Sequence, residues 1–110
     1  MLEKKYRMLA TRDFERVFAR GGLVPGPFFL IRYLKRSRPE SRFGFVVSTK
    51  VSKKAVERNT LKRRLREIAR GATPFLSTGY DYVFIMKKTA NKTPFAVLKE
   101  NAAQALQKVR

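Results

Sequence analysis

The sequence contains no cysteine and no histidine, and only eight of its 110 residues are acidic. Without cysteine and histidine the chain has no disulfide, no thiol nucleophile, no imidazole base and no metal site built on those side chains. The acids are Glu3, Asp13, Glu15, Glu40, Glu57, Glu67, Asp81 and Glu100. They are scattered, so no segment offers the carboxylate cluster that a two-metal nuclease requires. We therefore predict no catalytic residue and no metal ion held by protein side chains alone.

Long apolar runs are missing as well. No stretch approaches the roughly 20 apolar residues that cross a bilayer. The N-terminal MLEKKYRMLATRDF places charges where a signal peptide needs an unbroken apolar run. We therefore expect a cytoplasmic protein without a membrane span. With 44% apolar residues the chain can close one hydrophobic core and has no length for a second, which predicts a single domain over residues 1–110.

Basic residues dominate what is present. The 26 Lys and Arg residues give a formal net charge of +18, and like charges repel one another in a compact fold. A polyanionic partner would offset this repulsion. Nucleic acid is the leading candidate, because each phosphate neutralised by Lys or Arg releases a condensed counterion. An anionic membrane surface is the competing interpretation.

Apolar periodicity and chain breakers predict three helices and three strands. Thr11 is suited to cap the first helix, which Gly21-Gly22 ends. Gly71 is expected to end the second helix, and Thr93 to cap the third, with Pro94 in its first position. A short extra strand is also considered near residues 89–91. In chain order we expect a helix over 12–20, strands over 27–35 and 42–50, a helix over 53–70, a strand over 80–88 and a helix from 94.

This order predicts an α+β fold, an α/β sandwich with the sequence α-β-β-α-β-α. The polar loop KRSRPESR should join the first two strands as a hairpin. The second strand, the long helix and the third strand form a β-α-β unit, so those two strands should be parallel within a mixed sheet. The helices are expected to cover one face, and general rules favour a right-handed crossover.

Alternation along the strands assigns side chains to faces. In the first strand Phe29, Ile31 and Tyr33 share one face, and Phe28, Leu30 and Leu34 share the other. In the second strand the face carrying Gly44, Val46, Ser48 and Lys50 has small or polar residues, so a ligand can approach it closely. Single-stranded RNA, which stacks bases on rings and lays phosphates along cations, would suit an exposed sheet face of this kind near Tyr33.

The long helix contains the segment RNTLKRRLREIAR, residues 58–70. At about 100° per residue, Leu61, Leu65 and Ile68 form an apolar stripe that can dock on the sheet. A neighbouring sector of roughly 100° gathers polar and basic residues, and Arg58 lies at the seam between stripe and sector. Neither Glu57 nor Glu67 falls inside that sector. The sector consists of Asn59, Lys62, Arg63, Arg66 and Arg70.

Several interpretations of these features stay open on the residues alone. Charge-rich helices are often only solvated surface, although the charge of the whole chain argues against that here. A DNA-recognition helix is another alternative, but this helix connects two strands and is not the second of two helices joined by a tight turn. Phe14 and Phe18, four residues apart, are typical of a core-facing helix stripe.

Three segments together resemble the protein subunit of bacterial ribonuclease P. They are LATRDFERVFARGG, GFVVSTKVSKKAVERNTLKRRLRE and YDYVFIMKK, and the resemblance covers nearly the whole chain. The family signature usually reads Arg-Asn-Arg, whereas this chain has Arg58-Asn59-Thr60, which is expected to weaken one contact. The resemblance implies the fold of the second domain of a small-subunit ribosomal protein, with a left-handed β-α-β crossover in place of the usual hand.

The resemblance also implies function and partners. The chain is expected to bind the catalytic RNA subunit and to assist Mg²⁺-dependent removal of the 5′ leader from precursor tRNA, with catalysis and the Mg²⁺ ions residing in the RNA. Arg58, Asn59, Lys62, Arg63, Arg66 and Arg70 would bind the catalytic RNA. A cleft between the first helix and the sheet would bind the leader through Phe14, Phe18, Tyr33, Lys50, Lys53, Lys54, Lys87 and Lys88. A protein oligomer is not expected. The alternative is a ribosomal or general structural RNA-binding protein.

Overall fold

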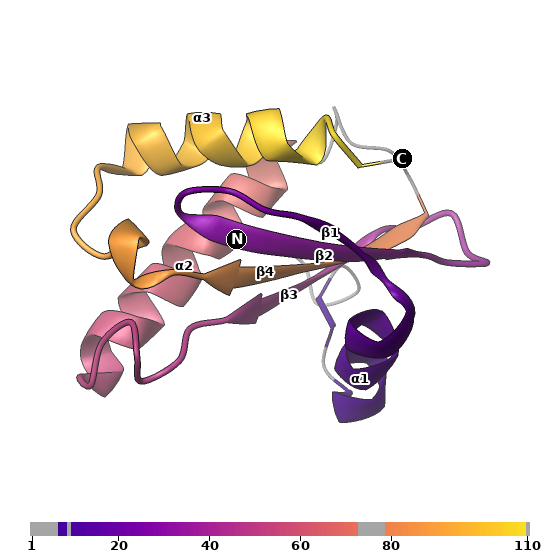
Figure 1. Cartoon of the computed structure of the whole chain (residues 1–110), viewed down its shortest axis with the longest axis horizontal. Coiled ribbons are helices and arrows are strands. Elements are labelled where there is room, and N and C mark those ends of the chain that lie inside the picture. The colour runs from indigo at the N-terminus through magenta and orange to yellow at the C-terminus, as the bar shows by residue number, and fades with distance from the viewer. Residues whose placement is uncertain (1–6, 9, 73–78, 110) are drawn as a thin grey trace.

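The computed structural model describes residues 7–8, 10–72 and 79–109. In this part of the chain, helices flank a four-stranded sheet (Figure 1). None of the described helices is long and apolar enough to cross a membrane. The elements are α1 Thr11–Arg20, β1 Gly22–Val24, β2 Phe29–Lys35, β3 Arg42–Val46, α2 Ala55–Ala72, β4 Tyr80–Met86, the 3₁₀ turn η3 Lys88–Ala90 and α3 Phe95–Leu106.

The predicted α-β-β-α-β-α order is confirmed, and the structure adds the short strand β1. This strand begins directly after α1 because the chain turns back tightly at two glycines. A Cβ atom at Gly21 would lie 2.5 Å from the carbonyl oxygen of Val17 and 2.6 Å from that of Tyr33. One at Gly22 would lie 2.4 Å from the ring of Tyr33, its partner in the β1–β2 pair. Only glycine allows this close return of the backbone.

Several predicted boundaries are wrong. Gly71 lies inside α2. The N-cap of α3 is Pro94, which was expected in the first helical position, and Thr93 before it donates its hydroxyl to the carbonyl of Thr89 at 2.8 Å. Residues 88–90 form a 3₁₀ turn in place of a strand, since the amide of Asn91 bonds back to Lys88. Strand β3 ends at Val46, four residues early, and a turn follows it. The loop after α2, residues 73–78, lies outside the described residues.

The sheet order is β1-β2-β4-β3, with β4 antiparallel to β2 and parallel to β3. The parallel pair and the mixed sheet are therefore confirmed. The predicted hairpin between β2 and β3 is wrong, because β4 lies between these two strands. Strand β4 carries YDYVFIM, and five of its seven residues are buried. A strand this apolar is most stable at the centre, where both of its faces are covered.

The helices lie on both faces of the sheet, which corrects the expectation of a single covered face. Helices α2 and α3 pack over Phe29, Ile31, Phe43, Tyr82 and Phe84 in the larger core. Helix α1 lies on the opposite face, where Val17 packs with Met8 and Val83 in a smaller core (Figure 1). Alternation along β4 explains the division, since Val83 points opposite to its neighbours Tyr82 and Phe84. The left hand of the crossover stays a prediction.

Candidate nucleic-acid interface

Helix α2 is anchored through the apolar stripe predicted for it. Leu61, Leu65, Ile68 and Ala69 are buried against the sheet and α3. Full burial of one such leucine contributes about 2 kcal/mol, so the rotation of the helix about its axis is well determined. The stripe therefore decides which basic residues reach solvent. Asn59, Arg63 and Arg70 are exposed, and Arg58, Lys62 and Arg66 are half-buried along the edges of the helix.

We call Arg58, Asn59, Lys62, Arg63, Arg66 and Arg70 the α2 basic face. Among the described residues, Arg70 has one weak ion pair, with its Nε 3.8 Å from Glu67 Oε2. The Nε of Arg66 is buried without an acceptor in the same set of residues. Thr60, which replaces the usual arginine, donates its hydroxyl to the carbonyl of Val56 at 3.0 Å. This hydroxyl is thus satisfied within the helix.

The first turn of α2 is organised by Ser52. Its Oγ accepts from the amide of Lys54 at 3.2 Å and donates to Oε1 of Glu57 at 2.7 Å. Arg58 donates from Nη1 to the carbonyl of Ser52 at 3.0 Å. A carboxylate near a helix N-terminus is favourable because it opposes the positive end of the helix dipole. Glu57 therefore has a structural role there, and Arg58 holds the loop against the helix as well as lining its basic face.

The second candidate surface lies on the α1 side of the sheet. The ring of Phe14 rests directly on Gly44, where a Cβ would lie 2.5 Å from Cε1 of the ring. Phe18 is 40% exposed, and the guanidinium carbon of Arg32 lies 5.8 Å from its ring centre. Beyond these rings the sheet presents the half-buried Val46 and Ile85. Here the sheet face is apolar, bordered by an exposed ring and a cation.

One predicted member of this surface is wrong. Tyr33 lies on the opposite face, where it packs against the larger core and makes an edge contact with Tyr80 at 6.2 Å between ring centres. Arg32 occupies the α1 side in its place. Its Nη2 donates to the carbonyl of Phe18 at 2.9 Å and lies 3.4 Å from that of Gly21, so it satisfies the end of α1. The alternation of β2 places Arg32 on the same face as Leu30 and Leu34. The sequence pattern alone could therefore have identified Arg32 as a member of this surface.

Five lysines lie where both surfaces meet. Strands β3 and β4 are parallel, so the segments that follow them leave the sheet at the same edge, and α2 begins there. The side chain of Asn91 joins these segments by donating to the carbonyl of Val51 at 3.3 Å. The structure thus brings together all five lysines that the sequence assigned to a cleft. They are Lys50, Lys53, Lys54, Lys87 and Lys88, all exposed except the half-buried Lys87.

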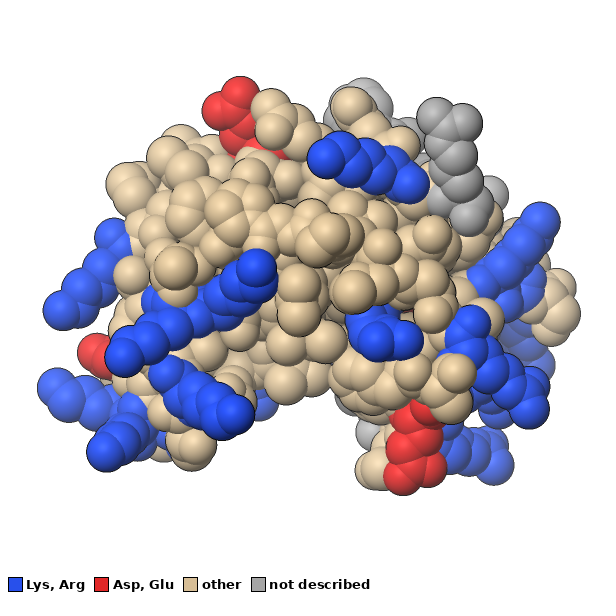
Figure 2. Space-filling view, viewed as in Figure 1, with Lys and Arg blue, Asp and Glu red and all other residues tan. Residues whose placement is uncertain are grey.

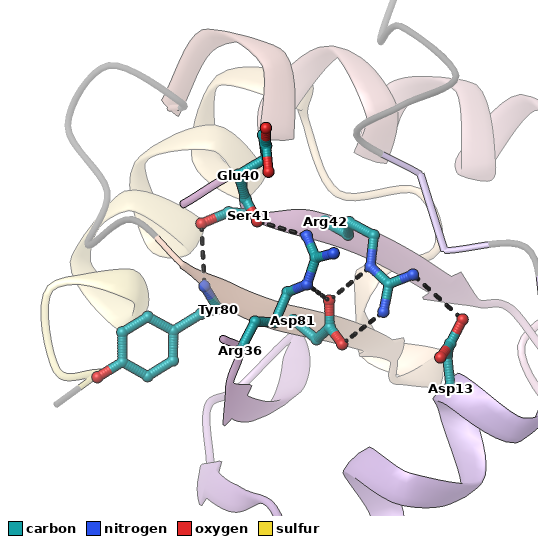
Figure 3. Close-up of polar contacts among 7 residues, drawn as sticks. All are labelled: Asp13, Arg36, Glu40, Ser41, Arg42, Tyr80 and Asp81. Atoms are coloured by element: carbon teal, nitrogen blue, oxygen red, sulfur yellow. Dashed lines mark hydrogen bonds and ion pairs between the residues drawn. The ribbon is translucent and has the colours of Figure 1, made fainter. Parts of the chain in front are cut away.

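An ion-pair network holds α1 on the sheet (Figure 3). Arg42 donates to both carboxylate oxygens of the buried Asp81, each at 2.9 Å. Its Nη1 donates to Asp13 of α1 at 3.2 Å. The hydrogen bond to Asp81, together with the charges of both carboxylates, raises the pKa of the Arg42 guanidinium despite its partial burial. Arg36 adds a second cation, with Nε 3.5 Å from Asp81 Oδ1.

Figure 2 shows how charge is distributed on one face of the molecule. Lys and Arg side chains gather at its two ends, over the start of α2 and over α1 with the β2–β3 loop. The lower edge is hollowed between these two groups. Sequence reasoning missed a further aromatic residue, Phe95 of α3, which is 39% exposed and borders a shallow pocket with Arg63 and Arg66. Among the described residues, no group of three or more acids could hold a metal ion.

Comparison with known proteins assigns the family. The family model described as Ribonuclease P matches residues 2–110. A ribonuclease P protein component from a Cyanothece species is 33% identical, over 96% of this chain and 93% of the relative. One from Caldanaerobacter subterraneus is 34% identical, over 98% and 92% of the two chains. The ribonuclease P protein of Thermotoga maritima superposes with a TM-score of 0.88 at 30% identity, covering 94% of this chain and 97% of that one. The chain therefore belongs to the ribonuclease P protein family, the protein subunits of an RNA-based endoribonuclease whose partner is the ribonuclease P RNA.

Proposed function

We propose that the α2 basic face docks on the catalytic RNA while the α1-side surface binds the single-stranded 5′ leader of precursor tRNA. The observation that carries the proposal is the position of the five lysines, between the two surfaces at the edge where β3 and β4 end and α2 begins. One strand of RNA leaving the catalytic RNA's active site can pass over these lysines from one surface to the other. The protein would then hold the leader beside the RNA that cuts it.

The chemistry of α2 supports docking on structured RNA. Its arginines can contact phosphates in bidentate geometry. The exposed amide of Asn59 offers a donor and an acceptor to a ribose hydroxyl or a base edge. The buried stripe of α2 prevents the helix from turning, so these groups stay on one side. A helix held in this way presents its cations in rows along the RNA backbone.

The chemistry of the α1 side supports binding of a single strand. An exposed ring at Phe18, a cation at Arg32 and a half-buried apolar floor at Val46 and Ile85 are the groups on which unpaired bases stack. Phosphates would follow the lysines at the border. Stacking of this kind tolerates different bases, which suits leaders of different sequence.

We further propose that the Mg²⁺ ions are held by the RNA subunit and that the protein acts in the cytoplasm as a single copy. The net charge of +18 supports the single copy, because two such chains repel each other. Sedimentation of the free protein at low salt tests this part, and a dimer would contradict it. Cleavage measured against Mg²⁺ concentration tests the proposal that the RNA holds the Mg²⁺ ions, because added protein should lower the Mg²⁺ concentration that the RNA requires.

Reconstitution with the catalytic RNA tests the α2 docking. The variant K62Q/R63Q removes two cations from the α2 basic face, and K99Q/K108Q removes two exposed cations from α3 and its end as a matched control. Each lost phosphate contact should reduce the slope of log affinity against log salt by about 0.7–0.9. For K62Q/R63Q we expect the slope of log affinity against log salt to be smaller in magnitude by about 1.4–1.8. Equal slopes for the two variants would contradict the docking.

A leader-length series tests the α1-side surface. Precursor tRNAs with no leader and with leaders of increasing length are titrated into the reconstituted complex. F18A should lose about 1–3 kcal/mol of the affinity gained from the leader, the value of one stacked base. V97A is the control, because Val97 of α3 is similarly exposed but lies on the other side of the sheet. Affinity that does not depend on leader length, or equal losses in the two variants, would contradict leader binding.

A further inference from the structure

Helix α1 carries a second row of cations that the proposed function does not use. Arg12, Arg16 and Arg20 are spaced four residues apart, and all three are exposed. At 1.5 Å per residue they follow one another about 6 Å apart along the helix, a spacing comparable to that of neighbouring phosphates in a nucleic-acid strand. The residues that attach α1 to the sheet, Phe14 and Val17, lie on the other side of the helix.

This row borders a groove. Between α1 and the loop that joins β2 to β3 the structure has a concave, polar region of about 410 Å³. Arg12 and Arg16 line it from α1, and Lys35, Arg36 and Arg38 line it from the end of β2 and the loop. Cations from two segments, separated by about 20 residues of sequence, thus converge on one opening.

The acids in the groove are already occupied. Asp81 accepts both hydrogen bonds from Arg42 and is paired with Arg36, and Asp13 is paired with Arg42. Four cations of the groove, in contrast, have no acidic partner within 4.0 Å among residues 7–8, 10–72 and 79–109. The groove therefore keeps a positive charge that its own carboxylates do not cancel. These four are Arg12, Arg16, Lys35 and Arg38.

Part of the arrangement is unfavourable to α1 itself, although Arg20 in the last turn suits the helix dipole. Like charges at i and i+4 destabilise a helix by about 0.2–0.5 kcal/mol per pair, and α1 has two such pairs along its row. Arg12 also lies in the first turn, where the helix dipole disfavours a cation. An external anion that binds between these residues would remove both penalties.

We propose that α1 and the β2–β3 loop form a second phosphate-binding surface for the sugar-phosphate backbone of RNA. It lies on the opposite face of the sheet from α2, because α1 packs on the smaller core and α2 on the larger one. Figure 2 shows the two basic groups at opposite ends of the view. The protein would then lie between two RNA segments, with the α1-side surface that we propose for the leader located between them. This inference rests on the family's RNA partner and adds a contact to it.

The test removes charge from the groove while keeping the helix. R12Q/R16Q is compared with K99Q/K108Q, which removes the same charge from exposed positions of α3 and its end. Glutamine is nearly as good a helix former as arginine, and circular dichroism with thermal unfolding checks that both variants fold. Each protein is titrated with the catalytic RNA alone and, after assembly, with precursor tRNA, at several salt concentrations.

R12Q/R16Q is expected to bind RNA about tenfold more weakly at ~0.1 M salt, with a slope shallower by about 1.4–1.8. The control should change the slope by less than about 0.5. A loss in the first titration identifies the catalytic RNA as the source of the phosphates, and a loss in the second identifies precursor tRNA. R12Q/R16Q matching the control in both titrations would overturn the proposal. K62Q/R63Q, measured alongside, separates this result from failure of the α2 docking, because each variant lacks cations of one surface only.

Discussion

Replacing Gly44 with alanine tests how α1 is seated on the sheet. A Cβ at this position would lie 2.5 Å from Cε1 and 2.6 Å from Cζ of Phe14, and 3.5 Å from Cβ of Met8. Carbon atoms pack at about 3.5–4.0 Å, so the ring has to move by about 1 Å. Phe14 cannot move alone, because Val17 is fully buried one turn later and Asp13 is ion-paired to the sheet. The added methyl group therefore strains the attachment of the whole helix.

Overpacking of this kind costs about 1–3 kcal/mol. We expect G44A to lower the free energy of unfolding by about 2 kcal/mol, which corresponds to roughly 8 °C in Tm for a domain of this size. Gly71 provides a control in which the same substitution has the opposite sign. Nothing lies within 4 Å of a Cβ at Gly71, which is inside α2. There alanine is favoured over glycine by about 0.8–1 kcal/mol, so G71A should be more stable than the parent chain.

Urea and thermal denaturation followed by circular dichroism measure both variants. F14A, which removes the ring, completes a double-mutant cycle with G44A. If the contact with the ring is the cause, G44A should cost at least about 1 kcal/mol less in the F14A background. A G44A variant as stable as the parent chain would refute the reasoning. So would a cost that F14A leaves unchanged, since the strain would then come from elsewhere.

Three other perturbations follow from the packing. D81N removes one charge of a buried pair and leaves Arg42 without its main partner, so we expect a loss of about 3 kcal/mol by thermal unfolding; a loss below about 1 kcal/mol would contradict the role of the network. Burial, with a smaller contribution from the neighbouring Tyr80, raises the pKa of Tyr82 to about 12. The unfolded chain releases this proton near pH 10, so stability should fall between pH 10 and pH 12 by about 1.4 kcal/mol per pH unit. Y82F should flatten this fall, and an unchanged profile would show that other groups cause it. R32M keeps an apolar stem but removes the donors to the end of α1, so amide hydrogen exchange should accelerate by about tenfold in the last turn of that helix; unchanged exchange would show that the cap is unimportant.

Local chemistry explains what could be predicted from the sequence. The apolar stripe of α2 is set by residues three and four apart, so Leu61, Leu65 and Ile68 were identified as its buried side, and the basic sector beside them followed from geometry. The charge of +18 and the absence of cysteine and histidine are properties of composition. They predict a nucleic-acid partner and no catalytic residue in the protein. The parallel pairing of β3 and β4 followed from the helix between them.

Tertiary structure decided which elements became neighbours and which face of the sheet each helix covers. The insertion of β4 between β2 and β3, and the placement of α1 on the opposite face from α2, both depend on how apolar surfaces far apart in sequence are buried together. Tyr33 and Arg32 illustrate the difference. Alternation determined that they point to opposite faces, but only the position of α1 showed that the exposed ring of Phe18 lies on the side of Arg32. The same position placed Arg12 and Arg16, which have no obvious role in the sequence, along one wall of a basic groove, because a groove needs a second segment and local periodicity does not specify one.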